Sequence, residues 1–406
     1  MEEWKEYRLG DLYDVHNGLS KGGLFFGLGY PFLSFKTVFN NYFLPSVLPD
    51  LVQTDEKEQK SYDIKRGDVF VTRTSETAEE LGMSSVALKD YPFATYNGFT
   101  KRLRPKHVSL VYPEFIGYYL RSKKFRALFY GLTSSMSTRA SLANGDLLGM
   151  RVLLPSLEVQ KRIAETLKSL DDKIEVNRRI NDNLEQQAQA LFKSWFVDFE
   201  PFKDGEFVES ELGMIPKGWR VGTLSEIAVI TMGVSPSGLS YNTKSEGDVF
   251  YQGRAEFGFR FPKRNMYTTE AKRFAEIDSI LFSVRAPVGD VNVAEEKCCI
   301  GRGLASIKAL YGYNSFVLYL MQYLKPFFDK YNSEGTVFGN INKSTLEGFK
   351  IIISPKEYQE KFQKIVGKMD CIIKSLEQES SRLSSLRDTL LPRLMSGELK
   401  INDISV

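Results

Sequence analysis

Two short segments of the sequence carry residue types that catalytic sites use. Residues 25–29, Phe-Phe-Gly-Leu-Gly, fit the F-x-G-x-G pattern of a methyltransferase cofactor loop, but no Asn-Pro-Pro-Tyr-like motif accompanies them. Asp50 and residues 58–60, Glu-Gln-Lys, imitate the carboxylates and lysine of a metal-dependent nuclease. The acidic, Gln- and Lys-rich surroundings are typical of a solvated segment. We therefore interpret the first segment as a glycine-rich turn and the second as an exposed loop.

Residues that could bind a metal or act as nucleophiles are few. The cysteines are the adjacent Cys298 and Cys299 and the distant Cys371, which gives no zinc-ligand spacing and no disulfide framework. The two histidines, His16 and His107, are isolated. No Gly-x-x-x-x-Gly-Lys-Ser/Thr loop for nucleotide phosphates is present. We expect no metal site, no catalytic residues and no cofactor bound to this chain.

Basic residues gather in two places, although the net charge of the chain is only +3. Residues 101–151 hold ten Lys or Arg against two acids, and residues 254–273 hold six against two. A single cluster of this kind is usually a solvated helix face. Matched clusters in the two halves of the chain favour an anionic partner such as DNA instead.

Reading DNA bases requires Arg, Lys, Asn or Gln, whereas phosphate contacts use cations and small hydroxyls. Candidates in the first half are Arg73, Thr74, Ser75, Thr77, Lys101, Arg102 and the loop from Ser134 to Arg139. Candidates in the second half are Arg254, Arg260, Lys263, Arg264, Arg285, Arg302, Asn340, Asn342 and Lys343. For each arginine the alternative is an ion pair with a neighbouring acid.

The elements that position these residues occur twice. The repeated order is a tryptophan (4 and 219), a β-rich run ending in arginine (67–75 and 278–287), an aromatic helix (115–120 and 316–320), a polar loop (131–144 and 333–342), a short strand (150–154 and 349–353) and a proline (155 and 355). Between these positions the two halves differ. A shared scaffold with divergent loops is typical of two recognition modules that read different targets.

Each half ends in a heptad pattern. Apolar residues alternate spacings of four and three, which predicts the seam of a coiled coil. The predicted seam comprises Ile163, Leu167, Leu170, Ile174, Leu184, Leu191, Phe362, Val366, Met369, Ile373, Leu383 and Leu390. Asn177 and Asn181 also lie on it, and buried polar seam residues select one partner and register. We expect the two helices to pair antiparallel within the chain; a core helix or an intermolecular zipper remains open.

These patterns predict an α+β protein with two mixed α/β domains, at 1–155 and 201–354. They are separated by two long helices, at 156–200 and 355–396, that pair as an antiparallel coiled coil, and a tail follows at 397–406. About forty residues of helix span roughly 60 Å. No apolar run reaches the roughly eighteen residues of a membrane span, and the acidic start is unlike a signal peptide. We expect a cytoplasmic protein without membrane association.

Several segments resemble one family. They are LFKSWFVDFEPFKDGEFVESELGMIPKGW, the pair LLPSLEVQKRIAETL and SPKEYQEKFQKIV, the phrase ILFSVRAPVGDV and the ending LLPRLMSGEL. Together they resemble the specificity subunit of type I restriction–modification enzymes. The resemblance covers nearly the whole chain, and the order of head, helix, head and helix is also that of the family.

The resemblance implies a host-defence and DNA-modification role without catalysis. Each of two target recognition domains would read one half of a split double-stranded DNA sequence, and the helix pair would set the spacer. Methyltransferase (M) subunits would carry S-adenosylmethionine. Restriction (R) translocase-nuclease subunits would use ATP and Mg. The family offers no motif that identifies individual DNA contacts.

Two other classes of function remain open. A two-headed coiled-coil adaptor that binds only proteins would have the same architecture. A single-chain modification or nicking enzyme would need the cofactor and phosphate motifs that the sequence lacks. The paired basic loops favour the DNA-reading hypothesis over both.

Overall fold

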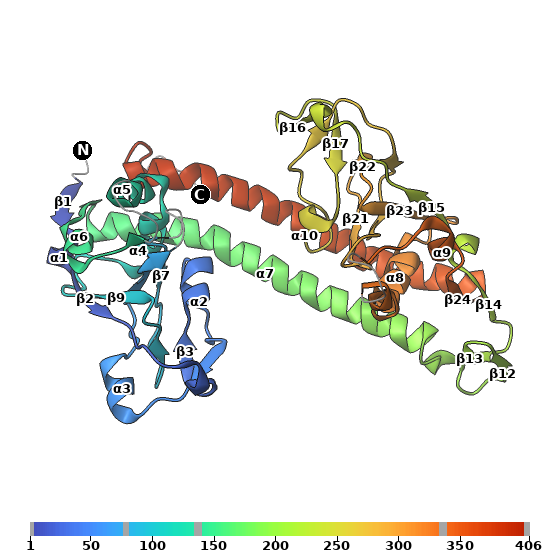
Figure 1. The fold of residues 1–406 in the computed structure, drawn as a ribbon, viewed down its shortest axis with the longest axis horizontal. Coiled ribbons are helices and arrows are strands. Elements are labelled where there is room, and N and C mark those ends of the chain that lie inside the picture. The colour runs from blue at the N-terminus through green and yellow to red at the C-terminus, as the bar shows by residue number, and fades with distance from the viewer. Residues whose placement is uncertain (1–3, 76–80, 134–139, 333–338, 402–406) are drawn as a thin grey trace. The chain divides into compact units, whose positions relative to one another are not determined.

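The computed structural model describes residues 4–75, 81–133, 140–332 and 339–401. The chain divides into two compact units (Figure 1): unit 1 comprises Met1–Glu175 and Ser380–Val406, and unit 2 comprises Val176–Glu379. Each unit contains a head of mixed strands and helices together with parts of both long helices. The predicted mixed α/β heads and long helices are therefore confirmed.

The head of unit 1 is built on a four-stranded antiparallel sheet in the order β2-β9-β5-β7. These strands are β2 (Tyr13–Asn17), β9 (Thr100–Pro105), β5 (Val69–Thr72) and β7 (Ser84–Val86). A smaller sheet joins β4 (Asp50–Val52), β3 (Phe26–Leu33) and β8 (Thr95–Tyr96), and two pairs join β1 (Lys5–Arg8) to β11 (Arg151–Leu154) and β6 (Thr74–Ser75) to β10 (Ala140–Ser141). The helices are α1 (Leu9–Leu12), α2 (Phe35–Asn40), α3 (Glu56–Ser61), α4 (Pro113–Arg121), α5 (Lys123–Thr133) and α6 (Asn144–Gly149).

The head of unit 2 repeats this plan with the strand order β15-β23-β20-β21. These strands are β15 (Ala228–Met232), β23 (Leu304–Ala309), β20 (Ile280–Ser283) and β21 (Val291–Val293). A five-stranded sheet joins β16 (Tyr241–Asn242), β18 (Tyr267–Thr268), β17 (Asp248–Tyr251), β22 (Cys298–Ile300) and β19 (Phe274–Ala275). The remaining elements are the hairpin β12 (Phe207–Ser210) and β13 (Gly213–Pro216), the pair β14 (Arg220–Thr223) and β24 (Lys350–Ile353), and helices α8 (Asn314–Phe328) and α9 (Lys343–Glu347).

Strand register makes the repeat explicit. Thr72, the last residue of β5, pairs with Thr100, the first of β9. Ser283, the last residue of β20, pairs with Leu304, the first of β23. Thr72 and Ser283 are therefore equivalent, and one residue farther on Arg73 is equivalent to Val284. The two strand-ending arginines, which sequence comparison matched with each other, are thus offset by one residue.

The long helices are α7 (Leu157–Phe196) and α10 (Lys356–Ser396). Each begins with a buried glutamine that bonds back to the preceding strand exit. Gln160 Nε2 donates to the Pro155 carbonyl at 3.0 Å, and Gln359 Nε2 donates to the Ser354 carbonyl at 2.9 Å. Gly397, with a φ of 74°, ends α10 in the left-handed conformation that favours glycine. The helices match the predicted ranges 156–200 and 355–396 closely.

The two helices contact each other within each unit, and they run antiparallel there. In unit 2 the rings of Phe192 and Phe362 lie 5.8 Å apart, and Asn177 Nδ2 donates to Glu379 Oε2 at 2.7 Å. In unit 1 Arg387 pairs with Asp171 at 2.6 Å. None of the twelve predicted seam residues is exposed, and both seam asparagines are buried. A continuous coiled coil through both units stays a prediction.

The ends of the long helices complete the cores of the heads. In unit 2 the ring of Trp219 packs against Phe196 and Phe199 at the end of α7, with centroids 5.9 and 5.3 Å away. In unit 1 the end of α10 contributes Leu394 and Met395 to the core of the head, where Trp4 packs against it. Both tryptophans thus seal a head against the end of a long helix.

Two sequence interpretations change in the structure. Residues 26–29, part of the predicted glycine-rich turn, begin strand β3. Residues 56–61 form the short helix α3, where an exposed loop was predicted. Glu58 N donates to Asp55 Oδ1 at 2.8 Å, and Asp55 N donates to Glu58 Oε2 at 3.0 Å. This reciprocal pair is a capping box, which starts a helix in a polar segment without an apolar face. Glu58, the imitation of a nuclease carboxylate, therefore caps a helix.

Candidate nucleic-acid interface

Several predicted contacts of unit 2 meet where strands β15 and β20 end and β23 begins. We name this border, together with residues 339–343, the loop edge of unit 2. Val284 N donates to the Gly303 carbonyl, and Ile341 N donates to the Val284 carbonyl, each at 3.0 Å. Arg285 and Asn340 form an antiparallel bridge beside them. These backbone bonds bring Arg285, Asn340 and the neighbouring Arg302 together, and all three are exposed.

The other two predicted contacts of this region lie at the start of α9. Asn342 caps the helix, because its Oδ1 accepts a hydrogen bond from Thr345 N at 2.9 Å. Lys343 follows it and lies 3.3 Å from Glu347, with more than half of its side chain exposed. A pair this open contributes little to stability, so the ammonium group can exchange its partner for a phosphate.

The loop edge of unit 1 is the equivalent border of β2, β5 and β9 together with residues 140–144. Arg73 N donates to the Phe99 carbonyl at 2.8 Å, and Leu142 N donates to the Arg73 carbonyl at 2.9 Å. Thr74 and Ser75 of β6 pair with β10. The predicted contacts Thr77, Ser134 and Arg139 lie outside the described residues. Sequence reasoning missed Phe99, which is 61% exposed; an aromatic residue within the turn Asn-Gly-Phe was the available signal.

Lys101 and Arg102 of unit 1 are buried, although both were predicted to contact DNA. Their exposed fractions are 3% and 8%. Lys101 Nζ donates to Asn144 Oδ1, and burial, with Arg73 nearby, lowers the pKa of its ammonium group. Arg102 Nη1 donates to Asp63 Oδ1 at 2.8 Å and to the Asp63 carbonyl at 2.6 Å. The structure favours a supporting role behind the loop edge for both side chains.

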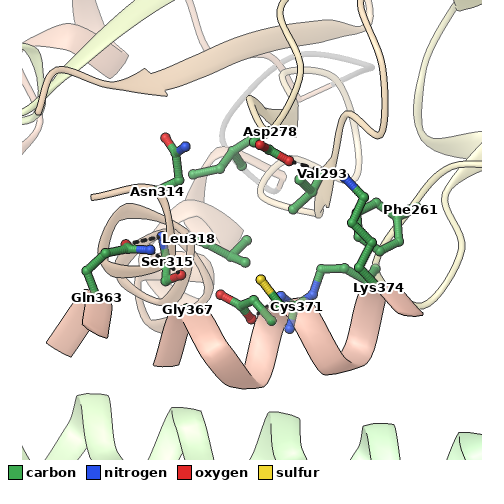
Figure 2. A pocket seen from close by; sticks show the side chains of 13 residues that line it. Phe261, Asp278, Val293, Asn314, Ser315, Leu318, Gln363, Gly367, Cys371 and Lys374 are labelled. Atoms are coloured by element: carbon green, nitrogen blue, oxygen red, sulfur yellow. Dashed lines mark hydrogen bonds and ion pairs between the residues drawn. The ribbon is translucent and has the colours of Figure 1, made fainter. Parts of the chain in front are cut away.

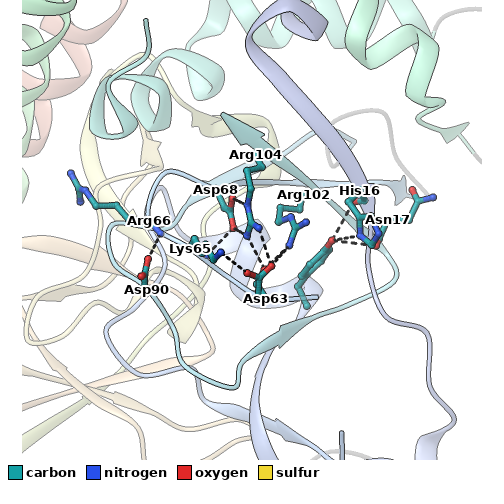
Figure 3. Close-up of polar contacts among 10 residues, drawn as sticks. His16, Asn17, Asp63, Lys65, Arg66, Asp68, Asp90, Arg102 and Arg104 are labelled. Atoms are coloured by element: carbon teal, nitrogen blue, oxygen red, sulfur yellow. Dashed lines mark hydrogen bonds and ion pairs between the residues drawn. The ribbon is translucent and has the colours of Figure 1, made fainter. Parts of the chain in front are cut away.

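Figure 3 shows the ion network to which Arg102 belongs. Asp68 is fully buried, and Arg104 donates to its two oxygens at 2.7 and 2.6 Å. Burial alone would raise the pKa of Asp63, but Arg104, Lys65 and Arg102 together hold it below its ordinary value. The network connects Arg102 and Arg104 of β9 to Asp63 and Asp68, which precede β5. These bonds cross-link strand β9 and the segment that leads into β5.

The basic segment 254–264 of unit 2 is held largely by acids. Arg254 pairs with Asp290, which also pairs with Lys325. Arg264 lies 3.0 Å from Glu295 and 2.7 Å from Glu296. Arg254 and Arg264 are both about half exposed and can still reach a partner at the surface. Lys263 is exposed and forms no ion pair with another described residue.

Arg260 is the most buried of these cations, with 4% of its side chain exposed. Its guanidinium donates to Glu185 of α7, to Asp370 Oδ1 of α10 at 2.6 Å and to the Tyr319 hydroxyl at 2.9 Å. Burial opposes its charge, yet Tyr319 and the two carboxylates raise its pKa above the usual value. The structure therefore favours a role in holding the head on the helices, where a DNA contact was predicted.

Arg260 also lines a pocket of about 220 Å³. Figure 2 shows this pocket from close by. Cys371 and Lys374 project into it from α10, and Lys374 lies 3.6 Å from Asp278. At its other end Gln363 accepts from Ser315 N at 2.9 Å and donates to Ser315 Oγ at 3.0 Å. These bonds join α10 to the start of α8, so the lining of this pocket is part of the junction between head and helix.

Metal-binding clusters and membrane-spanning helices are absent from residues 4–75, 81–133, 140–332 and 339–401. In this part of the chain no group of three or more His, Cys, Asp or Glu side chains is arranged to hold a metal ion. Nor does any helix in it combine the length and the apolar character that crossing a membrane requires.

Comparison with known proteins defines the class. The family model for the type I restriction modification DNA specificity domain matches residues 1–186 and 216–384. This match covers most of the chain, which therefore belongs to that family. Its characterised members are specificity subunits, the non-catalytic components of type I restriction–modification systems.

Individual relatives agree with this assignment. The MjaX specificity subunit of Methanocaldococcus jannaschii is 31% identical, covering 98% of this chain and 94% of the relative. The HindI specificity subunit of Haemophilus influenzae is 28% identical, covering 98% of this chain and all of the relative. The crystal structure of a type I S subunit from M. genitalium has a TM-score of 0.60 at 17% identity, covering 97% and 96% of the two chains, and supports the fold.

Proposed function

We propose that this protein recognises a bipartite DNA target, with one head on each half-site. The observation that carries the proposal is the duplicated loop edge. The hydrogen bonds around Arg73 repeat around Val284, whereas the connection that follows differs in length between the units. Thr72 to Gly82 spans one connection and Ser283 to Gly289 the other, and Gly82 and Gly289 bond back to the equivalent strand ends. One scaffold with two different loops suits two different half-sites.

The proposed contacts are the members of the predicted set at the loop edges and in the basic segment 254–264, with the buried Lys101, Arg102 and Arg260 left out. In unit 2 they are Arg285, Arg302, Asn340, Asn342 and Lys343, with Arg254, Lys263 and Arg264 at the flank. In unit 1 they are Arg73, Thr74 and Ser75, with Thr77 and the loop from Ser134 to Arg139 kept as predictions. Arginine and asparagine suit bidentate contacts to guanine and adenine, and the lysines suit phosphates.

We further propose that α7 and α10 set the spacer between the half-sites. Half-sites read from one side of B-DNA lie about 34–36 Å apart, one helical turn. A helix of 40 residues is about 60 Å long and can hold two heads at such a separation. A rigid spacer makes the gap part of the specificity, because a wrong gap deprives one head of its contacts.

The chain is proposed to dock methyltransferase subunits, which would supply S-adenosylmethionine, and through them restriction subunits that use ATP and Mg. A suitable surface in unit 2 is an apolar pocket of about 540 Å³. Met214 of the β12–β13 hairpin and Phe327 of α8 line it, and both are about half exposed. Partly open apolar surface of this kind is typical of protein interfaces.

The test begins with the modified sequence itself. Methylome sequencing of a strain with and without the gene should reveal one bipartite motif that depends on this chain. Purified chain with its methyltransferase partner should then shift a duplex that carries the motif, and added salt should weaken the complex steeply. A chain that binds its protein partners but no DNA at low salt would support the protein-only adaptor instead. Deleting one heptad from both helices should shorten the preferred gap without changing the bases read.

A further inference from the structure

Two leucines are unusually exposed. Leu24 is 96% and Leu239 is 99% exposed, and these are the two highest values among the large apolar side chains that the structure describes. An exposed leucine by itself is ordinary in a folded protein. Their positions are not, because one leucine lies in each head and the two occupy equivalent places.

The equivalence follows from backbone hydrogen bonds. Gly18 N donates to the carbonyl of Thr100, the first residue of β9, at 3.2 Å. Gly233 N donates to the carbonyl of Leu304, the first residue of β23, at 2.9 Å. The residue after each glycine bonds to the preceding strand. Leu19 N donates to the Tyr96 carbonyl at the end of β8 at 2.8 Å, and Val234 N donates to the Ile300 carbonyl at the end of β22 at 3.0 Å. Leu24 and Leu239 each lie six residues beyond these glycines.

Both leucines are the middle residue of the same short turn. The 3₁₀ turns are η1 (Gly23–Phe25) and η4 (Gly238–Ser240). The residue before the turn has φ −71° and ψ 157° in unit 1, and φ −60° and ψ 136° in unit 2. In each turn the backbone N–H of the third residue donates to the carbonyl of the residue before the turn. Phe25 N donates to Gly22 and Ser240 N donates to Ser237, both at 3.1 Å. One backbone geometry therefore presents a leucine to solvent in both heads.

The turns begin at the loop edges. A Cβ atom on Gly18 or Gly233 would lie 2.0 or 2.2 Å from a carbonyl oxygen of the strand connection beside it, so each chain runs tightly against its edge there. In unit 2 Arg302 N donates to Ser235 Oγ at 3.1 Å. Leu239 lies four residues after Ser235, hence within about 14 Å of it. A duplex that contacts Arg302 can therefore also reach Leu239.

We propose that Leu24 and Leu239 are apolar wedges, each placed against a base step of the half-site that its head reads. This inference rests on the proposed function. Leucine is among the side chains that DNA-bending proteins insert from the minor groove, where they partly unstack a base step. Such a wedge would make each head sensitive to the deformability of a step that its polar side chains never touch.

Duplex DNA fits these leucines better than a protein partner does. In unit 2 the leucine is flanked by Gly238 and Ser240, and the nearest exposed large apolar residue along the described chain is Val234, five positions before it, which is unlike the clustered apolar residues of a protein hot spot. In unit 1 Phe25 and Leu28 add exposed apolar surface, so the feature that both heads share is the leucine alone. Each turn is short and contains a glycine next to its leucine, so the leucine has room to enter a groove.

The experiment uses the full chain with its methyltransferase partner and duplexes with 2-aminopurine at successive steps of either half-site. The wild-type complex should raise the fluorescence at one step in each half-site. Leu24→Ala should abolish the signal in the half-site of unit 1 only, and Leu239→Ala that in the half-site of unit 2 only. Each variant should weaken binding about tenfold, the scale of one buried leucine side chain.

The controls are two other exposed apolar residues, Val108→Ala and Leu310→Ala. They follow the ends of β9 and β23, whereas the leucine turns lie near the starts of these strands. They should leave both signals and the affinity unchanged. Equal signals and affinities for wild type and both leucine variants would refute the wedge while leaving the proposed function intact. Loss of the methyltransferase partner with normal DNA contacts would assign the leucines to a protein interface. A wild-type complex that binds no DNA would refute both proposals.

Discussion

The two units contain the same tyrosine–aspartate contact but obtain its arginine from different places. In unit 1 the Tyr118 hydroxyl donates to Asp171 of α7 at 2.5 Å, and Arg387 of α10 pairs with the same carboxylate. In unit 2 the Tyr319 hydroxyl donates to Asp370 of α10 at 3.1 Å. Its arginine is Arg260, which comes from the head.

The origin of the arginine changes what the contact holds together. Arg387 joins α10 to α7, and the head of unit 1 reaches this pair through the Tyr118 hydroxyl. Arg260 joins the head of unit 2 to both helices, because it pairs with Glu185 of α7 and Asp370 of α10. The duplicated scaffold thus keeps its tyrosine and aspartate while the attachment of each head differs. In unit 2 one buried cation thus links the head to both helices at once, in addition to the packing of Trp219 and the bonds between Gln363 and Ser315.

The largest expected effect is therefore that of Arg260→Met. The substitution leaves Glu185 and Asp370 mostly buried without a cation, which costs about 3–5 kcal/mol. Hydrogen exchange should show the loss in unit 2 and spare unit 1, since exchange resolves units that open separately. A triple variant that adds Glu185→Gln and Asp370→Asn should recover much of the stability. Recovery would be absent if Arg260 acted by packing alone.

Arg387→Met sharpens the comparison, because the same loss in unit 1 should be smaller. Arg387 and Asp171 are each about a quarter exposed, so water can replace part of the ion pair. We expect a cost of about 1 kcal/mol, as for pairs near the surface. An effect as large as that of Arg260→Met would show that the two arginines do equivalent work.

A second comparison is between an exposed arginine of a loop edge, Arg285, and a buried arginine behind one, Arg102. Arg285→Ala should weaken DNA binding about tenfold and relax the discrimination at one base pair of the half-site, with unfolding unchanged. Arg102→Ala should instead destabilise unit 1 by about 2 kcal/mol, because it removes the two hydrogen bonds that the buried guanidinium donates to Asp63, which keeps only Arg104 and Lys65 as charged partners. Urea unfolding and mobility shifts on both variants separate the two roles. Normal stability of Arg102→Ala would contradict the assignment made from burial.

Gly18→Ala and Gly233→Ala test whether the equivalent glycines of the two units make equal contributions to stability. The added methyl group would meet a backbone carbonyl oxygen in both units, at 2.0 and 2.2 Å. We expect each variant to lose about 1–3 kcal/mol through backbone shifts, by similar amounts in the two units. A loss in only one unit would show that one loop can move aside.

The smallest effect concerns pH and unit 1 alone. Burial and the nearby Arg102 lower the pKa of His16, whose equivalent in unit 2 is Thr231. The unfolded chain binds the proton more readily, so the stabilising contribution is present above about pH 6.5 and declines as the pH falls below it. His16 is exposed, so screening keeps the change to a few tenths of a kcal/mol. His16→Gln should abolish this pH dependence in thermal unfolding.

Patterns local in the chain predicted most of the architecture. The heptad spacing located α7 and α10 within a few residues, and every predicted seam side chain, from Ile163 to Leu390, avoids exposure. The duplicated order of elements predicted two heads built alike. These features follow from helical and strand periodicity, which a linear sequence displays directly. The capping box of α3 is also present in the sequence, but the helix that it starts has no buried residue and hence no apolar periodicity to predict it.

Tertiary structure alone decided which cations face outward. Arg102 and Arg260 come from basic stretches that predicted exposed, DNA-facing side chains, yet both are buried, whereas Arg285 follows an apolar strand and is exposed. Their carboxylate partners lie 39 residues away for Arg102, and 75 and 110 residues away for Arg260. Composition near an arginine cannot reveal a partner so distant, because burial of a charge depends on which acids the fold brings to it. Exposed cations that could contact DNA and buried cations that support the fold are therefore told apart only in the folded chain.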